Sequence, residues 1–190
     1  MPTALTHAVL GAGAAAVFAL RMRRVKPCTV LGLGAIAGAS PDIDFVSFIT
    51  GIPYEHALGH RGITHSVAAT VAVAALIAAV VHARSRTHRV DRPFRPIGRD
   101  AVWLWAGLTV AGVVHALADM LTDGGLGIAI FAPFSWKRYF LPVTPIPVSP
   151  LWLSAETARV IGWEVLHLWP PAAAAIAIVF ILRRRCETGH

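Results

Sequence analysis

The stretch AVWLWAGLTVAGVVHALADML, residues 101–121, is apolar for most of its length and carries a histidine and an aspartate near its end. At about 1.5 Å per residue, a helix of this length crosses the roughly 30 Å hydrocarbon core of a membrane. Residues 63–83 form a second run of the same kind. Of the 190 residues in the chain, 56% are hydrophobic and only 14% are charged. This composition excludes a soluble enzyme and predicts an all-α, polytopic membrane helix bundle.

Three further apolar segments, residues 4–20, 28–39 and 162–182, bring the number of predicted transmembrane helices to about five. Residues 28–39 are few and rich in glycine, so alone they also fit a re-entrant segment. Basic clusters are expected on the cytoplasmic side of the membrane. Residues 21–26 and 84–99 both carry such a cluster, so both should lie in the cytoplasm. The chain between them must then cross the membrane an even number of times. Since residues 63–83 cross once, residues 28–39 must cross as well.

The chain has a net charge of +7, and most of its basic residues lie at the ends of the predicted spans. Of the 17 Lys and Arg residues, all but Arg61, Lys137, Arg138 and Arg159 fall within residues 21–26, 84–99 and 183–185. A nucleic-acid-binding protein would gather these charges on one polar face, so we expect no nucleic-acid partner. The distribution instead predicts an N-terminus outside the cytoplasm and the lipid bilayer as the principal partner.

Residues 123–150 are rich in glycine, proline and aromatic residues and are unlike a spanning helix. We expect them to form an interfacial cap at the outer surface, where aromatic side chains favour headgroup depth. Pro170 and Pro171 predict a kink in the last helix. The whole chain, residues 1–190, is predicted to be a single membrane-embedded domain.

Histidine and acidic side chains recur at one depth in these spans. Measured from the nearest cytoplasmic end at about 1.5 Å per residue, they lie roughly 21 to 28 Å across the membrane. The set contains His7, Asp42, His65, His115, Asp119 and Glu164. Because ionisable side chains are costly inside a membrane, their recurrence at one depth indicates a functional site.

Each of these residues alone also fits a structural role, such as a hydrogen bond between helices or a helix cap. Together they would each need a separate partner in an apolar bundle, whereas one metal centre satisfies all of them. His115 and Asp119 share a helix face. A mixed nitrogen and oxygen donor set favours Zn²⁺ first, with Mn²⁺ or Fe²⁺ as alternatives. With Asp44 and His60 nearby, there are more candidates than one ion needs. Either two ions bind or some of these residues orient the ligands and move protons.

Four short motifs carry a family resemblance. They are Thr6-His7, Pro41-Asp42-Ile43-Asp44, His60-Arg61-Gly62-Ile63-Thr64-His65-Ser66, and the run HALADMLTDGG at residues 115–125. In this order the motifs resemble those of the YdjM-like membrane-bound metal-dependent hydrolases, a family known for a LexA-regulated bacterial inner-membrane member. The resemblance covers nearly the whole chain.

The resemblance implies a bacterial inner-membrane hydrolase and, through a distant similarity to zinc phospholipases C and P1-type nucleases, phosphoester chemistry. On matching positions it makes His7, Asp42, Asp44, His60, His65, His115 and Asp119 the metal-binding and catalytic set.

We therefore expect one or two divalent ions at an outward-facing site that activates water against a phosphoester. Asp44 or Glu164 is the expected proton acceptor, although Glu164 is selected mainly by its depth. Arg61 is expected to bind the substrate phosphate, and the recessed site favours a lipid or lipid-linked substrate. The alternatives are a divalent-metal or proton transporter and a structural membrane protein. A transporter needs a polar path through the inner half of the membrane, which these spans do not provide.

Overall fold

The computed structural model describes residues 1–87, 98–150 and 154–188 and confirms a helical membrane bundle. Within these residues the only β-pairing consists of two isolated bridges. The helices are α1 (Ala4–Ala19), α2 (Pro27–Ala39), α3 (Val46–Thr50), α4 (Val67–Thr87), α5 (Arg99–Met120), α6 (Ala155–His167) and α7 (Trp169–Thr188), with two short 3-10 helices, η1 (Ser40–Phe45) and η2 (Ile63–His65).

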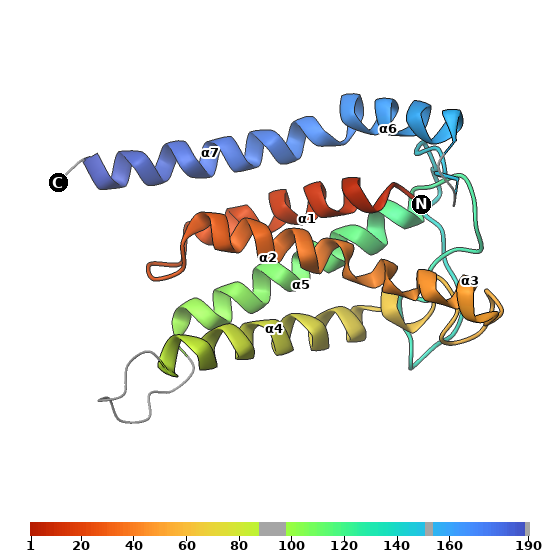
Figure 1. Cartoon of the computed structure of the whole chain (residues 1–190), viewed down its shortest axis with the longest axis horizontal. Coiled ribbons are helices and arrows are strands. Elements are labelled where there is room, and N and C mark those ends of the chain that lie inside the picture. The colour runs from red at the N-terminus through yellow and green to blue at the C-terminus, as the bar shows by residue number, and fades with distance from the viewer. Residues whose placement is uncertain (88–97, 151–153, 189–190) are drawn as a thin grey trace.

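The long helices run side by side along the length of the molecule (Figure 1). Helix α1 packs against α2, α5 and α7, while α5 also packs against α2 and α4. Glycines allow α1 and α2 to approach closely. A Cβ atom added to Gly11 of α1 would lie 2.4 Å from the carbonyl oxygen of Gly34 in α2. Such close backbone contact is typical of helix pairs in membranes.

The predicted spans all correspond to helices in the bundle. Three segments, Pro27–Thr50, Val67–Arg84 and Arg99–Met120, are long and apolar enough to cross a membrane, and the pair α6 and α7 counts as a fourth if taken together. Helix α1 has 16 residues, which is below the roughly 20 of a usual span. With η1 and α3, which extend α2 to Thr50, the second predicted span is long enough to cross a membrane.

Two boundaries differ from the predictions. Helix α4 begins at Val67 rather than at residue 63, because the Ser66 side chain accepts a hydrogen bond from the backbone N–H of Ala69 and so caps the helix. The last span consists of two helices that meet at 45° at Leu168, two residues before Pro170. This bend confirms the predicted kink, because proline lacks the N–H that a helix interior needs.

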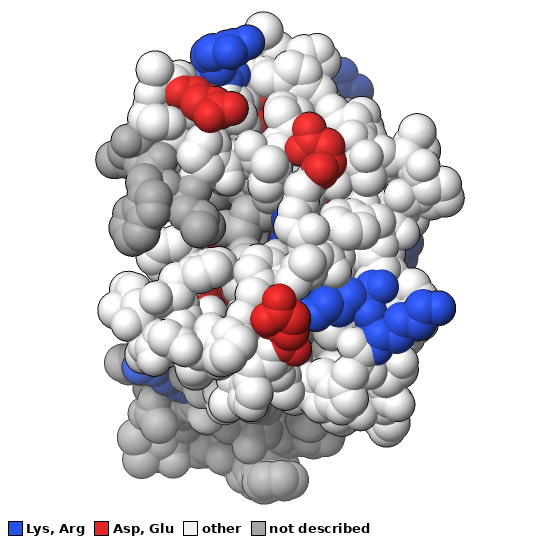
Figure 2. Space-filling model, turned by 90° about the vertical axis from the view of Figure 1, so that its right-hand side faces the viewer, with Lys and Arg blue, Asp and Glu red and all other residues white. Residues whose placement is uncertain are grey.

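The two ends of the bundle differ in character. The turn that carries the basic residues between α1 and α2 lies at the same end as the C-terminus, and the N-terminus lies at the opposite end (Figure 1). Residues 123–150 form irregular chain, as predicted, and reach across the bundle end that carries the N-terminus. Figure 2 looks onto this end and shows a few acidic and basic side chains among mostly uncharged residues. Most of the predicted cytoplasmic loop, residues 88–97, lies outside the described residues.

Candidate metal centre

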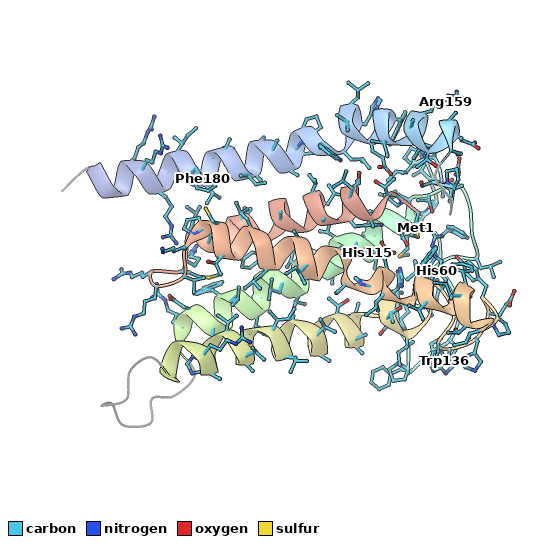
Figure 3. The ribbon with its side chains drawn as sticks, viewed as in Figure 1. Met1, His60, His115, Trp136, Arg159 and Phe180 are labelled. Carbon is cyan, nitrogen blue, oxygen red and sulfur yellow. The ribbon has the colours of Figure 1, made fainter. Side chains whose placement is uncertain are left out.

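Four histidine and aspartate side chains meet inside the end of the bundle that carries the N-terminus. Asp42 comes from η1, His65 from η2, and His115 and Asp119 from the last turns of α5. Figure 3 shows His115 within the bundle and His60 closer to this end. His65, His115 and Asp119 are completely buried, and the Asp42 side chain is 8% exposed. The sequence therefore brings together polar groups from three separate segments in an apolar interior.

One atom from each of these four residues forms a ring. Oδ1 of Asp42 lies 3.8 Å from Nε2 of His65 and 3.7 Å from Nε2 of His115. Oδ2 of Asp119 closes the ring at 3.5 Å from Nε2 of His65 and 4.0 Å from Nε2 of His115. Ligands bound at about 2.0–2.2 Å to one tetrahedral ion are themselves separated by roughly 3.3–3.6 Å. The ring is therefore only slightly wider than a loaded metal site.

All four ring atoms are buried and lack a hydrogen-bond partner. Buried polar atoms in proteins are almost always paired, because an unpaired one costs about 1 to 3 kcal/mol. Oδ2 of Asp119 has an ion-pair partner in Nε of Arg61, and a cation held between the four atoms would give all of them a partner. Two nitrogens and two carboxylate oxygens fit Zn²⁺, and with additional water ligands they also fit Mn²⁺ or Fe²⁺.

The outer nitrogens of the two histidines have oxygen partners. Nδ1 of His115 donates to the carbonyl oxygen of Gly38 at 2.7 Å. Nδ1 of His65 lies 3.0 Å from both Oδ2 of Asp44 and Oγ1 of Thr64. These partners assign the proton to Nδ1 of each ring and leave the Nε2 lone pair directed into the ring of four atoms. Carbonyl and carboxylate partners of this kind orient histidine ligands in metal sites.

His7 of α1 adjoins the ring and extends the donor set. Its imidazole stacks on that of His115 with 3.7 Å between ring centroids. Its Nε2 lies 3.1 Å from Oδ1 of Asp119, and its buried Nδ1 has no hydrogen-bond partner. His7, Asp42 and His115 also meet the distance requirements of a metal site, and so do His65, His115 and Asp119. Two overlapping groups that share His115 are compatible with one ion or two.

Asp44 and His60 belong to the predicted metal set but contact each other outside the ring. Nδ1 of His60 donates to Oδ1 of Asp44 at 2.6 Å, while Nε2 of His60 lies 2.9 Å from the sulfur of Met1. Oδ2 of Asp44 accepts hydrogen bonds from the Thr64 hydroxyl and from the backbone N–H of Arg61. Asp44 therefore connects His60 to the ring ligand His65.

Arg61 is the only buried cation among the described residues, and it is 1% exposed. Its Nε lies 3.2 Å from Oδ2 of Asp119, and its two terminal nitrogens donate to Thr122 and to the Gly124 carbonyl. The residue has a φ of 60°, a left-handed conformation that costs a side chain about 1 to 3 kcal/mol. In this arrangement the guanidinium offsets carboxylate charge, and a contact with substrate phosphate stays a prediction.

Glu164 of α6 is fully buried and has partners other than the ring residues. Oε1 accepts from the Thr3 backbone N–H at 2.7 Å, and Oε2 accepts from the hydroxyls of Thr3 and Thr6 at 2.6 and 2.7 Å. Trp169 donates in turn to the Thr6 hydroxyl at 2.9 Å. Glu164 thus fastens α6 to the first turn of α1, just before His7. A role as proton acceptor stays a prediction that these contacts do not favour.

The loop that carries His60 is held by Arg138 of the cap. The guanidinium donates to the carbonyl oxygens of Tyr54, His60 and Arg61 and lies over the Tyr54 ring. Burial raises the pKa of Tyr54, so its hydroxyl stays protonated at neutral pH. Burial also lowers the pKa of Arg138, but arginine remains charged at neutral pH. The cap segment therefore fixes the approach to the metal centre.

Sequence reasoning missed several of these partners. Thr3, Thr6, Thr64 and Thr122 hold Glu164, Asp44 and Arg61. Thr6 and Thr64 each directly precede a site histidine, and this position could have indicated that they hold site residues. The Gly38 carbonyl has no comparable signal, because every residue carries one.

Comparisons with known proteins agree with this architecture. The curated inner membrane protein YbcI of Escherichia coli (strain K12) is 33% identical over 194 residues, an alignment that covers 97% of this chain and the full length of YbcI. No solved structure matches the chain significantly. A family model described as YdjM inner membrane protein matches residues 1–185. The chain therefore belongs to the YdjM inner membrane protein family.

Proposed function

We propose that this protein is a metal-dependent hydrolase that cleaves a phosphoester of a lipid or lipid-linked substrate, at a site facing away from the cytoplasm. The observation that carries the proposal is the ring of four buried donor atoms from Asp42, His65, His115 and Asp119, none of which has a hydrogen-bond partner. When bound there, a divalent cation lowers the pKa of water and polarises a phosphoryl oxygen.

The residues around the ring have distinct tasks in this proposal. Asp42 is the least buried ring residue and offers two unpartnered oxygens, so it forms the open side of the centre. Asp44 and His60 form the proton-accepting pair. Because His60 donates through Nδ1 to Asp44, its Nε2, which lies 2.9 Å from the Met1 sulfur, carries the lone pair that would take a proton once Met1 moves aside. Arg61 compensates the charge of Asp119, which limits repulsion of an anionic phosphoester.

The core of the bundle favours a hydrolase over a transporter. The other half of the interior is filled by a cluster of buried apolar side chains that includes Ala15, Ala19, Leu104 and Leu108. An ion that crossed the membrane would need polar groups along this path. Within the described residues, every group suited to a metal ion lies in the half that carries the ring.

The test combines metal analysis with an activity panel. Protein purified in detergent should carry at least one divalent ion per chain, and Asp42→Ala or His115→Ala should remove most of it. The exposed loop residue His56 supplies the control, since His56→Ala should retain the ion. The panel contains phospholipids, lipid phosphates and nucleotides, and phosphate or headgroup release is measured.

The proposal predicts release from at least one lipid phosphoester, which both ring variants abolish. Unchanged metal content in both ring variants would overturn the metal centre. Metal accumulation by proteoliposomes without hydrolysis of any panel member would replace the hydrolase with a transporter.

A further inference from the structure

An apolar crevice opens between α2 and α4. Its volume is about 100 Å³. Both helices pack against α5 and have little contact with each other, so α5 forms the floor. Leu108 of α5 lines this floor and is completely buried. The crevice therefore results from the separation of α2 and α4 above α5.

The walls of the crevice are mostly apolar, although Ser40, Thr64 and Thr70 also line it. Ala37 lines it from α2, while Ala69, Val73 and Ala74 line it from α4. Small side chains on both walls leave a slot between two helices that each lie within a candidate membrane span. Because most of the wall is apolar, a polar ligand would find few hydrogen-bond partners there, whereas a hydrocarbon chain needs none.

One end of the crevice shares its walls with the metal centre. Pro41 and Ile43 line the crevice and flank the ring residue Asp42. Thr64 also lines it and directly precedes His65, whose Nδ1 lies 3.0 Å from the Thr64 hydroxyl. Residues of η1 and η2 that line this end of the crevice are therefore direct sequence neighbours of the ring residues Asp42 and His65.

The mouth of the crevice continues into an exposed apolar row. Ile43, Val46 and Ile49 are 71%, 52% and 72% exposed and follow one another along η1 and α3. These side chains would be unfavourable in water, but they are suited to contact with acyl chains. The mouth accordingly opens toward lipid.

We propose that this crevice holds one hydrocarbon chain of the lipid phosphoester whose phosphate reaches the metal centre. The identity of the reacting group rests on the proposed function, but occupancy of the crevice does not. A chain that leaves the bilayer for an apolar slot exchanges one apolar surrounding for another and gains little affinity. Its contribution is to orient the phosphate end beside Asp42 and His65.

Occupancy is tested first without any need for activity. The full chain is placed in phosphatidylglycerol vesicles that contain phosphatidic acid with a diazirine at the middle of one acyl chain. After irradiation, mass spectrometry should find the label on Ala69 and Val73 at least several-fold above Val80. Val80 is the matched reference, because it lies two turns along the same helix and has similar exposure, 44% against 38% for Val73. Equal labelling of Val73 and Val80 would mean ordinary lipid contact and would overturn the crevice site.

The second test uses Val73→Trp, which fills the crevice, beside Val80→Trp, which does not. Val73→Trp should slow hydrolysis of long-chain phosphatidic acid at least tenfold and leave a four-carbon-chain analogue unaffected. Val80→Trp should change neither rate. Equal loss on both substrates, or loss in neither, contradicts the chain subsite. If the unmodified protein hydrolyses no phosphoester, the proposed function fails while the labelling pattern still decides the crevice.

Discussion

Oδ2 of Asp44 lies 3.0 Å from Nδ1 of His65, whose other ring nitrogen faces the Asp42 and Asp119 carboxylates. This relationship makes Asp44 an outer partner of the metal centre. A carboxylate in this position holds the imidazole in one orientation and raises its basicity as a ligand. The same carboxylate accepts a hydrogen bond from His60, so in the proposed function one side chain would affect both metal affinity and proton transfer.

Asp44→Asn should weaken metal binding by roughly 10- to 100-fold rather than abolish it, because the ring ligands remain while His65 loses its charged partner. Titration of metal-free protein against a competing chelator measures this change. Asp123→Asn is the control, since Asp123 is exposed and its carboxylate accepts from the Val148 backbone N–H. Equal affinities for the two variants would contradict the role of Asp44.

Glu164→Gln should lower the stability of the bundle by about 2 to 3 kcal/mol, since an amide replaces a carboxylate that accepts three hydrogen bonds from Thr3 and Thr6. Thermal unfolding in detergent measures the loss. Glu156→Gln, in the exposed first turn of the same helix, should leave the melting temperature unchanged.

The same pair of variants tests whether Glu164 only connects α6 to α1 or also accepts a proton in catalysis. General-base catalysis contributes roughly 10²–10⁴ in rate. A rate loss of that size in Glu164→Gln, at unchanged melting temperature and metal content, would restore Glu164 as the proton acceptor.

Much of the fold was predictable because long apolar runs must form helices in a membrane. The pairing of His115 with Asp119 also followed from their spacing, as α5 is regular at that point. Depth and residue type do not report the direction of a side chain, however. Asp42 and Asp44 lie two residues apart in a 3-10 helix, and only Asp42 faces the ring.

Glu164 illustrates the same limit. Its predicted depth matched that of the site residues, but its lateral position depends on the 45° bend between α6 and α7, which directs its carboxylate to the first turn of α1. The tertiary arrangement, rather than local pattern, decided these roles.

Cysteine labelling should place residues 84–99 in the cytoplasm and the cap outside it, as the positive-inside rule requires. In a background without Cys28 and Cys186, Lys137→Cys should react with an impermeant reagent in intact cells, and Arg92→Cys should react only after lysis. The reverse pattern would place the metal centre toward the cytoplasm, and the substrate would then have to be sought there.

Gly38→Ala should damage packing and metal binding together. A Cβ at this position would lie 2.5 Å from the His7 carbonyl oxygen and 2.8 Å from Cα of Gly11, so α1 and α2 would have to separate. Overpacking of this kind costs about 1 to 3 kcal/mol. It would also displace the Gly38 carbonyl that accepts from His115, which should weaken metal binding at least about tenfold.

The control for Gly38→Ala lies in the same helix. A Cβ added to Gly32 meets no atom within 4 Å, so Gly32→Ala should keep full metal affinity. It should also stabilise α2 by about 0.5 to 1 kcal/mol, because alanine is the better helix former. Chelator competition and thermal unfolding on both variants test the two effects at once. If Gly38→Ala lowers stability but binds metal as tightly as Gly32→Ala, the Gly38 carbonyl does not orient His115 and only the packing argument survives.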